Sequence, residues 1–150
     1  MADSEMKIFI GMNRALNAIH RASDQIFRKY GLTRGQFAVL EALYHKGVLS
    51  IGCVQALVLT TGGNIPVIVR NLEKQGYLTR RRDGGDRRKY MLDITPEGRR
   101  LMDRAYPENE ASIKRMIGVW TQDEQESLVA AFLRFRSCHK AREETKGENE

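Results

Sequence analysis

Apolar residues recur at steps of three and four along most of the chain, which predicts a mainly helical protein. The first such run extends from Ser4, the expected N-terminal cap, to Gly31, which ends it. A helix of about 26 residues spans roughly 39 Å, longer than a small domain needs within itself. We therefore expect this helix to pack against a partner subunit or a second helical arm.

Two shorter helices follow the first one. Thr33 is a good N-cap for a helix that Gly47 ends, and Ser50 begins a further short helix that runs to Leu57. The next residues read Thr-Thr-Gly-Gly-Asn, which is typical of a turn.

A fourth helix contains Pro66 and ends at Gly76, a left-handed C-terminal cap. A proline deep inside a helix costs about 3 kcal/mol, because it removes a hydrogen bond and crowds the preceding turn. We therefore expect the helix to begin at about Asn64, so that Pro66 falls in the first turn, where no amide bond is lost.

The hydrophobic period then changes from 3.6 to 2, which predicts a β-hairpin. Residues 77–81 and 90–94 form its strands, and residues 82–87 have the Asp and Gly content of a turn. Three short helices followed by a hairpin define a winged helix-turn-helix. The fold class is therefore mainly α with a small β-hairpin wing.

The segments outside this unit are helical on both sides. Thr95 caps a helix that Pro107 is expected to kink or interrupt, and Thr121 caps the last helix. We expect a DNA-binding domain at residues 31–95. The flanking residues 1–30 and 96–150 together form a helical dimerisation region.

The charge distribution points to the same hairpin. The 150 residues are 41% hydrophobic and 29% charged, which is enough for a buried core and a soluble surface. The net charge is +6, and eight basic against three acidic residues between Arg70 and Tyr90 supply +5 of it. A basic block of this kind favours a polyanionic partner, most often nucleic acid.

Other classes of protein fit less well. No apolar run approaches the 20 or so residues that cross a bilayer, and the N-terminus does not resemble a signal peptide, so we expect an intracellular protein that avoids membranes. The sequence has no nucleophile motif or phosphate-binding loop, so we expect neither catalysis nor a cofactor. We expect no metal site either, because the candidate ligands are far apart along the chain: Cys53, Cys138, His20, His45 and His139.

The fourth helix has the composition of a helix that enters the major groove of DNA. Such a helix needs small or polar residues at its leading end and basic residues along its outer edge. Hydroxyls and free amides bind phosphate, amide side chains bind base edges, and apolar groups contact thymine methyls. The alternative is an ordinary solvated face. The candidate residues are Thr60, Thr61, Gly63, Asn64, Pro66, Val67, Arg70, Asn71 and Lys74.

The hairpin tip suits the minor groove. An arginine held at such a tip fits a narrow groove, where the negative potential is deepest. Asp86 precedes Arg88 by two residues and can pair with it, and Arg87 and Lys89 add charge. The alternative is a mobile hairpin with a surface ion pair worth about 0–1 kcal/mol.

These stretches resemble the MarR family of bacterial transcriptional regulators. The similar segments are GLTRGQFAVLEAL, TTGGNIPVIVRNLEKQGYLTRR and DRRKYMLDITPEG. The resemblance implies a cytoplasmic homodimer with interleaved terminal helices, residues 64–74 as the recognition face and Arg88 in the minor groove. Two positions depart from the family pattern: Pro66 stands where a polar residue is usual, and Arg70 where an Asp is frequent.

Family members commonly respond to small aromatic or phenolic compounds, or to oxidants. The resemblance implies an effector cleft between each arm and its DNA-binding lobe, with Met12, Leu16, His20 and Tyr44 as lining residues. The alternative for these four is core or dimer packing. The family's redox sensors usually carry a cysteine near the N-terminus, and this chain has none there.

The most consistent interpretation is a homodimeric transcriptional repressor that binds double-stranded DNA. A small aromatic effector releases it from an inverted-repeat operator. Two alternatives share the fold. One is a protein-binding adaptor whose basic face is incidental, and the other is a repressor that senses oxidants through Cys53 or Cys138.

Overall fold

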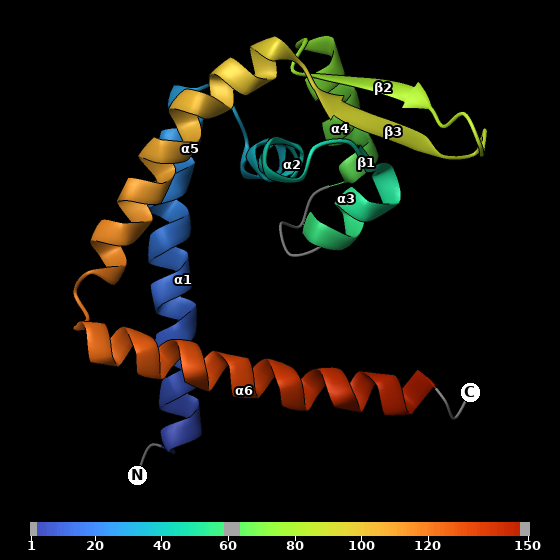
Figure 1. Ribbon diagram of the computed structural model, residues 1–150. Helices are drawn as coiled ribbons and strands as arrows, with labels where there is room; N and C mark the ends of the chain where they lie inside the picture. The colour runs from blue at the N-terminus through green and yellow to red at the C-terminus, as the bar shows by residue number, and fades with distance from the viewer. Residues whose placement is uncertain (1–2, 59–63, 148–150) are drawn as a thin grey trace. The chain divides into compact units, whose positions relative to one another are not determined.

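The computed structural model describes residues 3–58 and 64–147, with side chains described to residue 140 (Figure 1). It forms two compact units, residues 1–113 and 114–150. The elements are α1 (Ser4–Lys29), α2 (Arg34–Lys46), β1 (Leu49–Ser50), α3 (Ile51–Val58), α4 (Ile65–Lys74), β2 (Leu78–Arg82), β3 (Tyr90–Ile94), α5 (Pro96–Ile117) and α6 (Gln122–Gly147). This mostly helical chain with one small antiparallel sheet confirms the predicted fold class.

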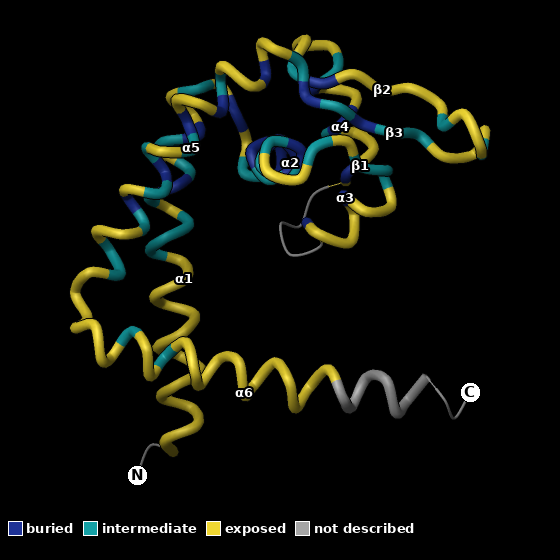
Figure 2. The backbone as a smooth tube through the Cα atoms, viewed as in Figure 1, coloured by how far each residue is buried: buried dark blue, intermediate teal, exposed yellow. Residues whose placement is uncertain are grey.

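Helix α2 is the centre of the first unit, and Figure 2 shows it as largely buried. Its side chains Val39, Leu40 and Leu43 are fully buried, and α2 contacts α1, α3, α4 and β3. Leu72 of α4 and Leu92 of β3 belong to the same cluster. One core therefore orients both the fourth helix and the hairpin.

The sheet has three strands in the order β1-β3-β2, all antiparallel. Strand β1 is absent from the sequence prediction, because two residues are too few to show an alternating pattern. Strand β2 begins at Leu78, one residue later than predicted. The reason is that the backbone N–H of Tyr77 donates to Leu72 O at the end of α4, next to Gly76 with φ 79°.

Most predicted helix starts are confirmed. Thr33 and Gln36 form a reciprocal capping box at the start of α2, and Gly47 ends this helix with φ 78°. Asn64 is the N-cap of α4, and Pro66 lies in the first turn of this helix, as expected for a proline. The predicted start of the fourth helix is therefore correct.

One local prediction is wrong, and one of the two outcomes expected at Pro107, an interruption of the helix, does not occur. Asp3, not Ser4, occupies the N-cap of α1, and it makes no side-chain capping bond. Helix α5 continues through Pro107 without interruption. Met102 and Ala105, which precede the proline in α5, are fully buried in the hydrophobic core, and tertiary packing of this kind outweighs an unfavourable local propensity.

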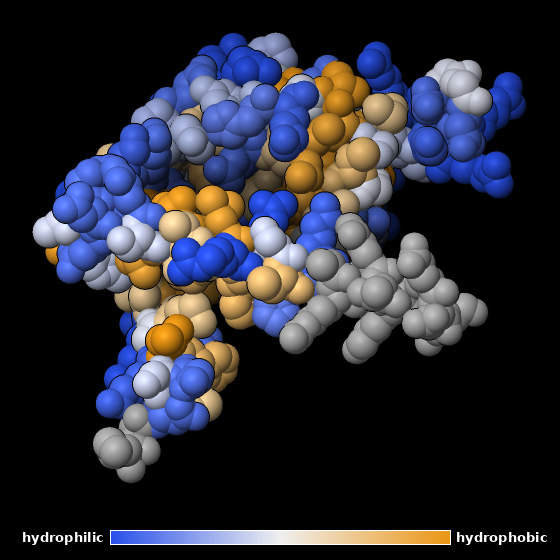
Figure 3. Space-filling view, turned by 60° about the horizontal axis from the view of Figure 1, so that its bottom comes forward, coloured by the Kyte–Doolittle hydropathy of each residue, from blue (hydrophilic) through white to orange (hydrophobic). Residues whose placement is uncertain are grey.

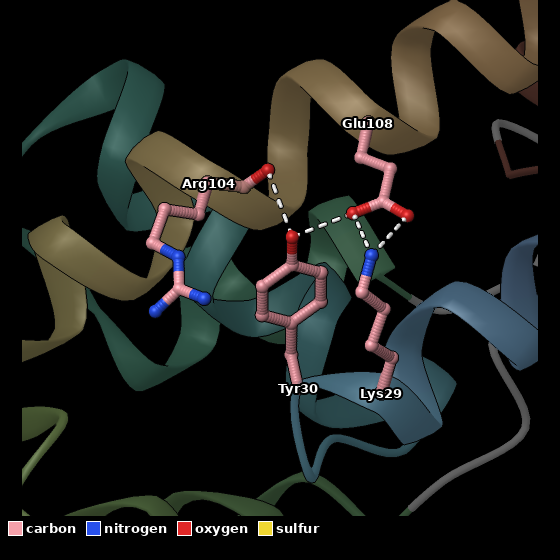
Figure 4. A network of polar contacts seen from close by, with 4 residues as sticks. All are labelled: Lys29, Tyr30, Arg104 and Glu108. Carbon is pink, nitrogen blue, oxygen red and sulfur yellow. Dashed lines mark hydrogen bonds and ion pairs between the residues drawn. The ribbon is translucent and has the colours of Figure 1, made fainter.

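The end of α1 is attached to α5 by polar contacts (Figure 4). Glu108 accepts hydrogen bonds from Lys29 Nζ at 2.8 and 3.0 Å and from the Tyr30 hydroxyl at 2.6 Å. The guanidinium of Arg104 lies 5.5 Å from the Tyr30 ring centroid. These contacts fix the C-terminal end of α1 to α5.

None of the described helices combines the length and the hydropathy needed to span a bilayer.

Candidate nucleic-acid interface

Helix α4 has one buried and one exposed face. Ile65, Val69 and Leu72 are buried in the core. Six of the residues predicted for recognition lie within the described part of the chain, and all six are exposed: Asn64, Pro66, Val67, Arg70, Asn71 and Lys74. The side chains of this set are therefore accessible to a partner, as the helical period requires.

The start of α4 is arranged as an anion-binding end. The side-chain oxygen of Asn64 accepts from the Val67 backbone N–H over 3.5 Å, so the Asn64 Nδ2 group can donate to a nucleic acid without loss of the cap. The Val67 and Ile68 N–H groups donate to Asn64 and Pro66 has no N–H, so the attraction of this end for phosphate comes mainly from the partial positive charge of the helix dipole.

The hairpin tip is a hydrogen-bonded turn. The Asp83 N–H donates to Lys89 O at 2.9 Å and the Lys89 N–H donates to Asp86 O at 3.0 Å. The Asp86 carboxylate accepts from the Arg88 backbone N–H at 3.0 Å and lies 3.5 Å from Arg88 Nε. These bonds favour a fixed tip over the mobile alternative.

The tip presents its arginine to solvent. The Arg88 side chain is 93% exposed, and Arg87 and Lys89 beside it are also exposed. Figure 3 shows the end of the hairpin, at the right of the view, covered by hydrophilic side chains. One unit of the molecule thus carries an exposed helix face and a projecting basic tip.

Comparison with known proteins fits this geometry. Residues 21–105 match the family model of the transcriptional regulators SarA/Rot. The HTH-type transcriptional regulator MhqR of Bacillus subtilis (strain 168) is 34% identical over 134 residues, which are 89% of this chain and 92% of MhqR. The MarR-family regulator Sco3205 of Streptomyces coelicolor, solved in complex with DNA, superimposes with a TM-score of 0.79 at 17% identity, over 91% of this chain and 88% of Sco3205. The chain belongs to the MarR family of transcriptional regulators.

Membership in the MarR family makes the chain a DNA-binding transcriptional regulator and not an enzyme, as the sequence predicted. It also favours the regulator over the protein-binding adaptor. A further solved structure has the same fold: the organohalide-sensing regulator RdhR-CbdbA1625 in its 2,4-dichlorophenol-bound form, with a TM-score of 0.79 and 17% identity over 91% of this chain and 82% of that regulator.

Three of the predicted DNA-binding residues of this MarR-family chain, Thr60, Thr61 and Gly63, lie outside the described residues. The contacts of every predicted DNA-binding residue with a duplex stay predictions.

The four predicted effector residues lie in different surroundings. Met12 and Leu16 are exposed on α1. His20 Nδ1 lies 3.1 Å from Arg34 Nη1, where α1 meets α2. The Tyr44 hydroxyl donates to Asp103 over 2.6 Å, which raises the pKa of Tyr44 and joins α2 to α5. The structure thus places His20 and Tyr44 at helix contacts and leaves Met12 and Leu16 open.

A hollow of about 330 Å³ lies at the junction of α1 and α2. Within it, the Arg34 guanidinium makes a bidentate contact with Asp24, at 3.1 and 2.6 Å, and thereby lowers the pKa of Asp24. None of the four predicted effector residues is among its lining residues, which are Asp24, Arg28, Leu32, Thr33 and Arg34.

Both cysteines are free and exposed. Cys53 lies in the first turn of α3, where its backbone N–H donates to Ser50 Oγ at 3.1 Å. Cys138 lies in α6, in the second unit. Oxidant sensing by either thiol stays a prediction.

Sequence reasoning missed one group beside the wing. Arg80, Arg82 and Tyr90 lie close together at the hairpin, and Arg80 also pairs with Glu73 of α4. The alternating pattern of the strands was visible in the sequence, but the pairing register, which decides which residues face one another, was not.

Proposed function

We propose that this chain is a homodimeric repressor that binds an inverted-repeat operator and releases it when a small aromatic or phenolic compound binds. The observation that carries the proposal is the common core of α4 and the hairpin. Because one core supports both elements, the exposed face of α4 and the Arg88 tip can enter neighbouring grooves of one duplex together.

In this proposal α4 reads the major groove. Arg70 and Lys74 neutralise phosphates, Asn71 and the Asn64 Nδ2 group donate to base edges or phosphates, and Val67 contacts a thymine methyl. Arg88 occupies the minor groove, where Asp86 fixes its direction. A chain acting in this way works on chromosomal DNA in the cytoplasm.

The long helices support a dimer. In a soluble protein, apolar side chains this numerous on two helices are expected to be covered by a partner. In the proposed dimer two copies of α4, related by a twofold axis, enter successive major grooves about 34–36 Å apart, so the operator is an inverted repeat. Figure 3 shows some of these side chains in orange along α1, the arm that ends in grey N-terminal residues. The exposed apolar residues are Met6, Ile8, Phe9, Ile10, Met12 and Leu16 of α1, and Val129, Phe132, Leu133 and Phe135 of α6.

An effector can act through the contacts between the arm and the DNA-binding lobe. His20 meets Arg34 between α1 and α2, and Tyr44 meets Asp103 between α2 and α5. A phenolic ligand that competes for these polar groups changes how α2 sits against the helices beside it. The 2,4-dichlorophenol complex of RdhR-CbdbA1625 supports a phenol as the ligand class. A coupling of about 1–3 kcal/mol releases DNA 5- to 150-fold.

The dimer is tested by sedimentation velocity. Phe9→Asp combined with Leu16→Asp places two charges in the apolar stripe of α1, and we expect a monomer. Val48→Asp makes the same chemical change at an exposed apolar residue between α2 and β1, and we expect an unchanged dimer. A wild-type chain that is monomeric at micromolar concentration would refute the proposal.

The effector is tested by release. The duplex is first selected from a random pool, and the complex is then titrated with 2,4-dichlorophenol while fluorescence anisotropy follows the labelled DNA. We expect a saturable loss of binding. Undiminished binding with 2,4-dichlorophenol and with other small phenols and quinones would remove the effector from the proposal and leave the DNA contacts standing.

A further inference from the structure

The core-facing side of the hairpin carries a group of side chains that the DNA contacts above do not use. In the β2–β3 ladder Arg80 pairs with Leu92, and Arg82 pairs with Tyr90. Directly paired residues of antiparallel strands lie on the same face of the sheet. Leu92 is fully buried, so this face of the sheet is the one that packs on the core. Arg80, Arg82 and Tyr90 lie on the same face, where the hairpin extends past the core.

These three side chains are in contact. The guanidinium carbon of Arg80 lies 5.0 Å from the Tyr90 ring centroid, and that of Arg82 lies 5.7 Å from it. A guanidinium at this distance is attracted by the negative face of the ring. Two cations held by one ring also repel each other, so the arrangement favours an anion that neutralises both.

Arg80 also connects the hairpin to α4. Its Nε lies 3.5 Å from Glu73 Oε2, and the two side chains are 34% and 38% exposed. Arg88 at the tip, by contrast, is 93% exposed. The strands of the wing are thus joined through Arg80 to the helix proposed to read the major groove, while the Arg88 side chain at the tip is open to solvent (Figure 1).

The geometry of duplex DNA gives this restraint a use. Neighbouring major and minor grooves share one sugar–phosphate strand as their common wall. A helix in one groove and a hairpin tip in the next lie on opposite sides of that strand. Side chains on the strands of the hairpin between its tip and α4, such as those of Arg82 and Tyr90 in the ladder pair next to the tip, therefore face its phosphates.

We infer that Tyr90 is a positioning residue for DNA binding. Together with Arg80 and Glu73 it fixes the hairpin relative to α4, so that Arg88 reaches the minor groove while α4 occupies the major groove. It also holds the Arg82 guanidinium toward a phosphate of the strand between the two grooves. This inference rests on the proposed contacts of α4 and Arg88.

A double-mutant cycle on operator affinity tests the positioning role. Tyr90→Leu removes the aromatic face, and Tyr90→Phe keeps it. We expect Tyr90→Phe to bind like the wild type and Tyr90→Leu to bind about tenfold more weakly, with most of that loss absent in an Arg88→Ala background, because the two residues act together. Arg82→Gln should reduce the slope of log affinity against log salt by about one phosphate contact.

The outcomes separate this inference from the proposed function. If Arg88→Ala weakens binding and Tyr90→Leu adds the same loss with or without Arg88, the positioning role is refuted while the wing contact stands. If Arg88→Ala has no effect on affinity or sequence preference, the proposed wing contact itself is wrong, and the inference fails with it.

Thermal unfolding shows whether each variant is folded. Should Tyr90→Leu fail to fold, the same cycle with Glu73→Gln decides the question, because Glu73 lies outside the hydrophobic core. Coupling between Glu73→Gln and Arg88→Ala supports the restraint, and independent effects overturn it.

Discussion

Tyr30, which directly follows α1, donates its phenolic hydrogen to the carboxylate of Glu108 in α5 over 2.6 Å. Lys29 binds the same carboxylate at 2.8 Å. The hydrogen bonds from Lys29 and Tyr30 lower the pKa of Glu108, and Glu108 in turn raises the pKa of both partners. One ionised carboxylate therefore holds the end of the long first helix against α5.

This contact predicts a pH-dependent stability. Because the pKa of Glu108 is lowered in the folded state, its stabilising contribution is complete above the ordinary carboxyl pKa of about 4 and is lost as the pH falls through the lower folded value. We expect Glu108→Gln to be less stable than the wild type toward urea at pH 7, by a small amount because the groups are exposed. The difference should shrink at pH 3, and a difference that grows in acid would contradict the account.

Gly98 should not tolerate alanine, although it lies in a helix. A Cβ there would lie 2.2 Å from Tyr77 O, the oxygen that accepts from the Thr95 backbone N–H. Overpacking of this kind costs about 1–3 kcal/mol, more than the helix propensity that alanine adds.

Gly52 of α3 is the matched control for Gly98. Among the residues that the structure describes, an added Cβ there meets only Ser50 Oγ, at 3.9 Å, so Gly52→Ala should stabilise by up to about 1 kcal/mol. The two free energies of unfolding, measured in urea, should change in opposite directions. Equal changes would show that the close approach of α5 to the chain at Tyr77 is not as described.

The capping box predicts a loss of stability at Thr33. Its hydroxyl accepts from the Gln36 backbone N–H at 3.2 Å, and the Gln36 side chain accepts from the Thr33 N–H at 2.9 Å. Thr33→Ala should cost about 1 kcal/mol in the free energy of unfolding. Thr33→Ser keeps the hydroxyl and should remain close to the wild type, and a Thr33→Ala variant as stable as Thr33→Ser would contradict the role of the cap.

Arg88 is expected to contribute directly to operator affinity. Arg88→Ala should weaken binding by about 1–3 kcal/mol and relax the preference at A·T pairs under the wing. Arg100→Ala is the control, because Arg100 is an exposed arginine of α5 that pairs with Glu97, away from the hairpin tip. Competition with duplexes substituted at the minor-groove positions measures both effects, and equal losses for the two variants would indicate only a non-specific effect of charge.

Local signals in the sequence predicted much of the fold. Thr33, Gly47, Asn64 and Gly76 act within one helical turn of their own positions, so their effects can be predicted without knowledge of the tertiary structure. Pro66 even fixed the start of α4, because a proline is tolerated only in the first turn.

The errors have non-local causes. Strand β1 exists because β3 pairs with Leu49, and α5 continues past Pro107 because side chains around it are buried. The group at Arg80, Arg82 and Tyr90 depends on the strand register and on Glu73 from another element. Contacts of this kind join segments that the sequence pattern treats separately.

The central claim is that a wing and a neighbouring helix, repeated in a dimer, read duplex DNA. The most direct measurement is the affinity of the purified chain for an inverted-repeat duplex selected from a random pool, compared with a scrambled duplex of equal composition in the same salt. We expect the selected duplex to bind at least about 10³-fold more tightly, in the range of specific DNA-binding proteins. Equal affinities for the two duplexes would contradict it.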